Sequence, residues 1–100
     1  MKIFRMGKLF GHFLADGDLA NRFRFAQVEP QLSAVQTIVF DFEGVNEATD
    51  SFMNACFAHL VADHGEEVLR KIKFKNCSQL VQHFIRSATT LGLSERSKLA

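Results

Sequence analysis

The sequence predicts a small α/β domain, in which a mainly parallel sheet of roughly four to five strands carries helices mostly on one face. Two observations lead to this fold class. Short apolar runs alternate along the chain with longer amphipathic stretches, as expected of parallel strands joined by helical crossovers. The segment 71–75 alternates lysines with apolar residues, so one face of that strand should meet water.

Composition and charge limit the class of protein. The 100 residues are 47% hydrophobic and 23% charged with a formal net charge of +1, which is typical of one globular domain and favours neither nucleic acid nor membrane as a partner. No apolar run approaches the roughly 20 residues of a membrane span, and charges interrupt residues 1–5, so we expect a cytoplasmic protein. We expect residues 1–92 to form the domain and residues 93–100 to be a polar C-terminal tail.

The N-terminal half is expected to contain two strands and a helix. Apolar alternation predicts strands over residues 2–5 and 8–13, separated by a turn at residues 6–7. Asp18 is a suitable N-cap for a helix over residues 19–29, which the proline that follows should end or kink. Two apolar edges are expected on this helix, one of Leu19, Phe23 and Ala26 and one of Phe25, Val28 and Leu32.

The C-terminal half is expected to alternate strands and helices. A strand over residues 37–42 leads into a helix over residues 50–63, and a helical turn at residues 66–70 precedes a strand over residues 71–75. A last helix starts after the polar residues 76–78. We expect the two strands to pair in parallel at the centre of the sheet. The core is expected to contain Phe40, Phe42, Phe52, Cys56, Phe57, Leu60, Phe74 and Phe84.

The junction between the central strand and the next helix is the main candidate for a functional site. Gly44 can adopt the positive φ that a turn needs, and Thr49, Asp50 and Ser51 are all residue types that cap helices. One interpretation is that Thr49 and Ser51 are caps and nothing more. The functional interpretation is that Ser51 carries a phosphate, which the free N–H groups of a helix start would stabilise.

Asp41 interrupts an otherwise apolar strand. It is expected to be a buried structural acid that accepts hydrogen bonds from backbone or hydroxyl donors. The alternative is a functional carboxylate with a raised pKa. The sequence does not show the base and oxyanion site that catalysis by Asp41 would need.

Three segments resemble the STAS-like domain of unknown function found in bacterial proteins, namely Val39-Phe40-Asp41-Phe42-Glu43-Gly44-Val45, Thr49-Asp50-Ser51-Phe52 and Ile72-Lys73-Phe74-Lys75-Asn76. That family is similar to the STAS domains of anti-sigma factor antagonists, in which a serine of an Asp-Ser-Ser-Gly segment at a helix start is phosphorylated by a partner kinase. In this chain Thr49-Asp50-Ser51-Phe52 stands in the place of that segment, and only Ser51 falls on the position of the phosphorylated serine. The resemblance implies a histidine-kinase-like ATPase or anti-sigma-type kinase as partner, and a docking rim of Gly44, Asn46, Thr49, Asp50 and Ser51.

Metal, cofactor and nucleic-acid functions are not indicated. The four histidines are expected on different elements or faces, and the two cysteines lack the spacing of a zinc site or a disulfide framework. The lysines of residues 71–75 are not accompanied by an exposed aromatic platform, so we expect them to form a solvated sheet face.

We therefore expect a non-catalytic protein-interaction module of bacterial signalling or transcriptional control. A phosphorylation switch at Ser51 is the leading mechanism, but Asp50 beside it offers another, in which this member stays permanently in a phosphate-like charged state. Two alternatives belong to other classes. One is a structural homodimer that associates through the lysine-bearing sheet face or an edge strand. The other is a small hydrolase or transferase that uses Asp41, Ser51 or Cys77.

Overall fold

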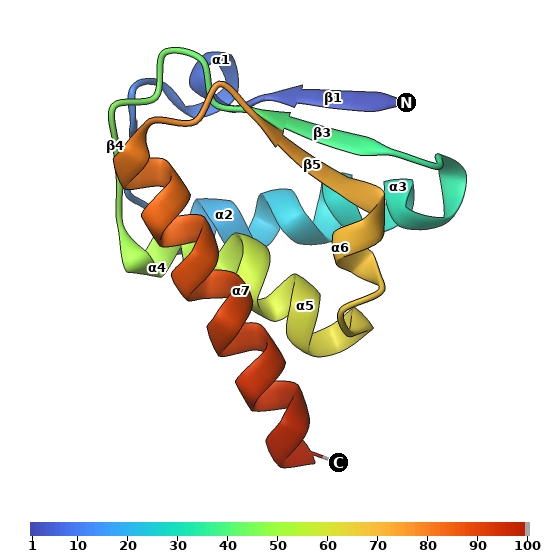
Figure 1. The fold of residues 1–100 in the computed structure, drawn as a ribbon. Helices are drawn as coiled ribbons and strands as arrows, with labels where there is room; N and C mark the ends of the chain where they lie inside the picture. The colour runs from blue at the N-terminus through green and yellow to red at the C-terminus, as the bar shows by residue number, and fades with distance from the viewer. Residues whose placement is uncertain (100) are drawn as a thin grey trace.

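The computed structural model describes the backbone of residues 1–99 and the side chains of residues 1–98 (Figure 1). Within this range the strands are β1 (Lys2–Arg5), β2 (Phe13–Leu14), β3 (Ile38–Asp41), β4 (Glu47–Ala48) and β5 (Ile72–Lys75). The helices are α1 (Met6–Phe10), α2 (Gly17–Phe23), α3 (Glu29–Ala34), α4 (Asp50–Met53), α5 (His59–His64), α6 (Val68–Lys71) and α7 (Gln79–Leu99), together with the π-helical turns η1 (Arg24–Val28) and η2 (Asn54–Ala58).

The strands form two small parallel sheets. β1, β3 and β5 form a three-stranded sheet with β3 in the centre, and β2 and β4 form a two-stranded sheet beside it. The expected parallel pairing of the central strand with the segment 71–75 is therefore confirmed, but the five strands of the described residues are divided between two sheets instead of forming one sheet of four to five strands. The reason is local: β2 and β4 have only two residues each, and a turn at Gly44 separates β4 from β3.

The helices α2, α4, α5 and α7 lie below the three-stranded sheet (Figure 1). The strands present a row of phenylalanines to them, because Phe4 pairs with Phe40 and Phe40 pairs with Phe74 in the parallel register. Phe57 of η2 packs edge-on against Phe40, with ring centroids 5.0 Å apart. The expected core is present, although Phe74 and Phe84 are only partly buried.

Residues 6–14 differ from the expected strand. Residues 6–10 form α1. Met6 and Phe10 both pack on the core, whereas Lys8 between them is exposed, which fits one face of a helix and not a strand, where all three side chains would share a face. Gly11 ends this helix, and its N–H donates to the carbonyl of Gly7 at 2.8 Å. Of the strand predicted over residues 8–13, only Phe13 lies in a strand, where it forms β2 with Leu14.

The elements α2, η1 and α3 form one continuous helical rod over residues 17–34. Asp16, not Asp18, is its N-cap, since the Asp16 carboxylate accepts hydrogen bonds from the N–H groups of the second and third residues that follow. The rod continues through Pro30, which lies at the start of α3 directly after the π-helical turn.

The π-helical turn also changes which side chains of this rod are buried. A π turn holds more residues than an α turn and so rotates the helix face that follows it. Arg24 is 5% exposed and Phe25 is 71% exposed, the reverse of the expected pattern. The two predicted apolar edges are thus correct only in part: Phe23 and Val28 are buried and Leu32 is partly buried, but Leu19, Ala26 and Phe25 are exposed.

The C-terminal elements follow the expected order. A second rod over residues 50–64 consists of α4, η2 and α5, and it starts at Asp50, as predicted. The residues that we assigned to a polar tail continue α7 as far as Leu99, and residue 100 lies outside the described range. Among the described helices, none combines the length and the apolar composition needed to cross a membrane.

Candidate functional site

The candidate site is the segment that follows β3, and we call its residues Gly44, Asn46, Thr49, Asp50 and Ser51 the rim. The segment leaves the sheet in a defined way. The N–H of Phe42 donates to the carbonyl of Lys75 at 2.9 Å, and the N–H of Val45 closes a turn on the carbonyl of Phe42 at 2.9 Å. Gly44 in this turn has φ +82°, a conformation that favours glycine.

The two-stranded sheet then fixes the rim to the N-terminal part of the chain. The N–H groups of Asn46 and Glu47 both donate to the carbonyl of His12, at 2.8 and 3.2 Å, and the N–H of Thr49 donates to the carbonyl of Leu14 at 2.9 Å. The side chains of Asn46 and Asp50 are exposed. The rim is therefore an anchored backbone that presents the side chains of Asn46 and Asp50 to solvent.

Thr49 is the N-cap of α4. Its hydroxyl oxygen accepts a hydrogen bond from the N–H of Phe52 at 3.1 Å and donates one to the carbonyl of Ala15 at 2.9 Å. The hydroxyl thus satisfies one free N–H of the helix start and also ties α4 to the segment before α2. Thr49 is therefore a helix cap, as the first of the two interpretations from the sequence stated.

Ser51 lies in the first turn of α4 and is exposed. Its hydroxyl has no hydrogen-bond partner within the part of the chain that the structure describes, because Thr49 already holds the cap position. Gly17 lies directly against it, and a Cβ on Gly17 would clash with the Ser51 hydroxyl oxygen. Ser51 therefore stands where the starts of α2 and α4 meet.

Carboxylates surround this meeting point. Asp16 caps α2, and Asp18 and Asp50 are the acidic residues in the first turns of α2 and α4. Each lies where the positive end of a helix dipole favours an anion. The helix starts beside Ser51 thus already hold negative charge, and an added phosphate would join acidic neighbours.

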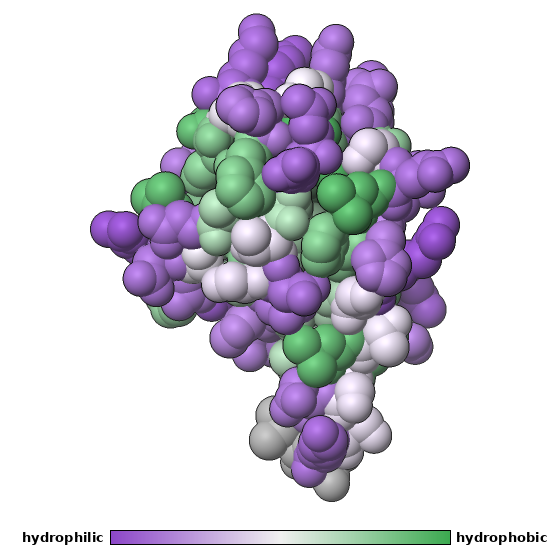
Figure 2. All heavy atoms as spheres, turned by 90° about the vertical axis from the view of Figure 1, so that its left-hand side faces the viewer, coloured by the Kyte–Doolittle hydropathy of each residue, from purple (hydrophilic) through white to green (hydrophobic). Residues whose placement is uncertain are grey.

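Figure 2 shows the side of the molecule on which β4 and α4 lie, the left-hand side of Figure 1. Hydrophobic residues gather in the middle of this face, and hydrophilic residues surround them. The elements that adjoin β4 carry exposed apolar side chains, Phe13 on β2 and Leu80 and Leu91 on α7. An apolar area with a polar border is typical of protein-binding surfaces.

Asp41 is partly exposed at the end of β3, and not buried as we expected. Its carboxylate accepts hydrogen bonds from the side-chain amide of Asn76 at 2.9 Å and from the N–H of Glu43 at 3.0 Å. The Asn76 amide and then the Glu43 N–H lower the pKa of Asp41, with smaller contributions from Lys75 and Arg5. A lowered pKa is the opposite of the raised value that the functional alternative for Asp41 required.

Cys77 follows β5 and is partly buried. Burial, and to a lesser extent the negative charge of Asp41, raise the pKa of the Cys77 thiol. A thiol with a raised pKa is protonated at neutral pH and is a weak nucleophile. Burial also raises the pKa of Cys56, which lies in the core.

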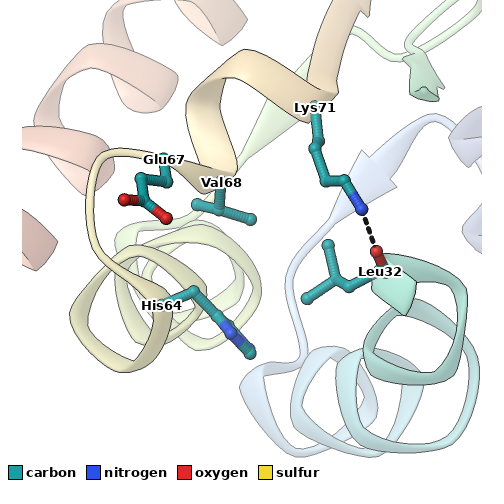
Figure 3. A pocket seen from close by; sticks show the side chains of 5 residues that line it. All are labelled: Leu32, His64, Glu67, Val68 and Lys71. Carbon is teal, nitrogen blue, oxygen red and sulfur yellow. Dashed lines mark hydrogen bonds between the residues drawn. The ribbon is translucent and has the colours of Figure 1, made fainter. Parts of the chain in front are cut away.

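A hollow of about 330 Å³ lies at the other end of the molecule, near α3 and α6. Figure 3 shows the side chains that line it, Leu32, His64, Glu67, Val68 and Lys71. The Lys71 ammonium donates to the carbonyl of Leu32, and the His64 imidazole lies 2.7 Å from a Glu29 carboxylate oxygen. Two of its polar side chains are thus engaged by the protein itself, and the hollow contains no rim residue.

Arg24 is a residue that sequence reasoning missed. It is a buried charged side chain, and its Nε donates to the carbonyl of Ala55 at 2.9 Å. One Nη donates to the side-chain oxygen of Asn21 at 2.7 Å, and the other lies 3.5 Å from Glu29. The signal in the sequence was the alternation of arginine and phenylalanine over residues 22–25, which conflicts with a regular helix.

The histidines and cysteines do not form a metal site in the described part of the chain, where no three side chains of His, Cys, Asp or Glu lie close enough to share a metal ion. His64 is engaged with Glu29, as stated above. His83 packs against Phe84 with ring centroids 5.7 Å apart.

Comparison with known proteins identifies the family. The family model described as the STAS-like domain of unknown function (DUF4325) matches residues 19–82, a stretch that contains the first helical rod from its third residue on, the whole second rod, β3, β5 and the whole rim. No curated protein and no solved structure matches the chain. The resemblance seen in the sequence is thus confirmed, and the chain belongs to the family of STAS-like domains of unknown function.

Proposed function

We propose that the protein is a non-catalytic interaction module of bacterial signalling or transcriptional control, which works in the cytoplasm and docks a protein partner on the rim. The observation that carries the proposal is the state of Ser51. The Ser51 side chain is exposed and lies at a helix start beside an apolar area. Its hydroxyl does not cap the helix, because the Thr49 hydroxyl does. These properties suit a regulated docking surface.

The proposed control is phosphorylation of Ser51 by a histidine-kinase-like ATPase, as in the anti-sigma factor antagonists that the family resembles. A phosphate adds up to two negative charges and three acceptor oxygens. The N–H groups in the first turn of α4 would stabilise it, whereas Asp50 and the acidic start of α2 would repel it. Phosphorylation would therefore change the charge and bulk of the docking surface and leave the fold intact.

Asp50 supports a second version of the same function. A carboxylate next to Ser51 gives the rim a permanent negative charge without a kinase. In this version Asp50 binds the partner directly, and Ser51 is only a neighbour. The two versions predict that different variants lose the partner, so an experiment can distinguish them.

The test is capture of the partner from a lysate of the native cell by immobilised parent protein and by Ser51→Ala, Ser51→Asp, Asp50→Asn and Ser33→Asp, with quantification by mass spectrometry. Ser33 is exposed on α3, away from the rim, so Ser33→Asp is a matched control for added charge. For a switch, Ser51→Asp alone should lose the partner. For permanent charge, Asp50→Asn should lose it. Equal capture by all five proteins would contradict the proposed function.

Catalysis is not part of the proposal. A hydrolase or transferase would need Asp41, Ser51 or Cys77 to act as an activated group. The raised pKa of Cys77 disfavours a thiolate, and the Asp41 carboxylate is occupied by Asn76 and Glu43. These contacts favour the interaction module over the enzyme.

A further inference from the structure

The three-stranded sheet has one face that none of the helices in residues 1–99 covers. Figure 1 shows the helices α2, α4, α5 and α7 below the sheet, and at the other side α1 and the segments that follow β3 and β5, all at one end. Alternation along the strands places six side chains on the uncovered face, in two register rows: Ile3, Val39 and Lys73, and then Arg5, Asp41 and Lys75. We call these six residues the open face.

An uncovered face is unusual for this kind of sheet. All-parallel sheets occur almost only with both faces covered, because their strands are apolar on both sides. Here Ile3 is 37% exposed, and Val39 in the centre is 8% exposed although no secondary-structure element lies over it. The open face thus has an apolar centre shielded only by the side chains around it.

The charges around that centre are mostly positive. Arg5, Lys73 and Lys75 are all exposed, and none of them forms a salt bridge within the described residues. The single carboxylate on the face, that of Asp41, is occupied by Asn76 and by the N–H of Glu43. Asp41 keeps its negative charge, which acts on Lys75 and Arg5, but three cations against one carboxylate leave the open face with a net positive charge that carboxylates of a partner can meet.

We propose that the open face docks an acidic amphipathic helix of a partner protein. The apolar edge of the helix covers Ile3 and Val39, and carboxylates on its flanks reach Arg5, Lys73 and Lys75. The dimensions of the open face agree with those of one short helix. Three strands spaced about 4.8 Å apart span about 10 Å, which is the diameter of one helix. Four residues of strand span about 13 Å, the length of about nine helical residues.

Other occupants fit this face less well. A second copy that pairs open face to open face would bring the same cations together, which costs energy through repulsion. A phosphate backbone or a layer of anionic lipid headgroups would satisfy the cations but would leave Ile3 and Val39 against polar groups. The open face contains no rim residue, so the proposal stands or falls independently of Ser51.

The test is an NMR titration of the whole chain with a designed amphipathic peptide of about 14 residues, with leucines on one edge and glutamates on both flanks. A second peptide has lysines in place of the glutamates. The variant Lys73→Glu/Lys75→Glu reverses two charges of the open face. Arg22→Glu/Lys98→Glu makes the same change of charge at exposed positions on the helices α2 and α7 and serves as the matched control.

The acidic peptide should shift the amide signals of Ile3, Val39 and Lys73 and saturate below about 1 mM. Its affinity should fall about tenfold or more in Lys73→Glu/Lys75→Glu and stay unchanged in the control variant. The lysine peptide should not bind. Shifts confined to another surface, equal binding of both peptides, or no saturation would overturn the proposal. So would binding of phosphatidylserine vesicles without binding of the peptide, or a dimer that Lys73→Glu/Lys75→Glu dissociates.

Discussion

At the scale of single residues, two hydroxyls at the start of α4 have different environments. Thr49 accepts from the N–H of Phe52 and donates to the carbonyl of Ala15, so the fold depends on it. Ser51, two residues later, makes neither kind of contact within the described residues. Because the fold does not use the Ser51 hydroxyl, this side chain is accessible to a partner or a kinase.

Phe57 connects the second helical rod to the sheet within the core. It is fully buried, and its ring packs edge-on against Phe40 at 5.0 Å and Phe74 at 5.3 Å. Phe57→Ala should lower the free energy of unfolding by about 3 to 5 kcal/mol, because it leaves a cavity between sheet and helix. Phe25→Ala, at an exposed phenylalanine, should change it by less than about 0.5 kcal/mol. Urea denaturation measures both, and equal losses would contradict this account of the core.

Asp41 should make stability depend on pH in the acid range. Its pKa in the folded protein is below the ordinary value of 3.8, so the unfolded state binds more protons there and stability rises with pH. The contribution is fully present above that ordinary value and is lost as the pH falls through the folded pKa.

The pKa of Asp41 can be measured by NMR titration of its carboxyl carbon in the parent and in Asn76→Gly. Glycine suits this site because Asn76 has φ +57°. Removal of the amide should raise the pKa of Asp41 toward its ordinary value, since Asn76 is the largest cause of the shift. An unchanged pKa would show that the Asn76 contact does not hold the carboxylate.

At the scale of elements, the two helical rods are joined through their π-helical turns. Arg24 at the start of η1 donates to the carbonyl of Ala55 in η2 at 2.9 Å. Within the first rod it also contacts Asn21 and Glu29. The buried guanidinium therefore fixes how the rod that leads to β3 lies against the rod that starts at the rim.

Removal of the Arg24 guanidinium should destabilise the fold. Arg24→Ala is expected to lower the free energy of unfolding by about 3 to 5 kcal/mol, because it leaves Glu29 and the Ala55 carbonyl without their buried partner. Arg24→Lys should recover less than half of the loss, since one ammonium cannot replace the planar fork of donors. Arg22→Ala, at an exposed arginine of the same rod, should be nearly neutral in the same urea experiment. Equal effects at both arginines would refute the proposed link.

The sequence predicts elements well where period and caps agree. The strand around Phe40 and the helix start at Asp50 are both found where the apolar period and the cap residues place them. Prediction from the sequence fails where an element is short or irregular. α1 has a single turn and β2 two residues, and a π-helical turn has no 3.6-residue period by which it could be recognised.

At the scale of the whole molecule, the sequence predicted the exposure of the rim but not the neighbours that shape it. Gly17 touches Ser51, and Asn76 holds Asp41, across 34 and 35 positions of the chain respectively. Contacts of this kind depend on how the elements pack, which apolar period alone does not reveal. The open face was visible in the lysine alternation of β5, but its apolar centre follows only from the register of three strands.

The rim and the open face give this small domain two separate surfaces, of which the rim is central to its proposed function. The most direct test is calorimetric titration of the captured partner with parent protein, with Ser51→Ala, and with protein that carries phosphoserine at position 51. The account predicts equal affinity for the first two and a loss of about tenfold or more for the phosphorylated protein, from added charge and bulk on the docking surface. The same affinity for all three would contradict a switch at Ser51.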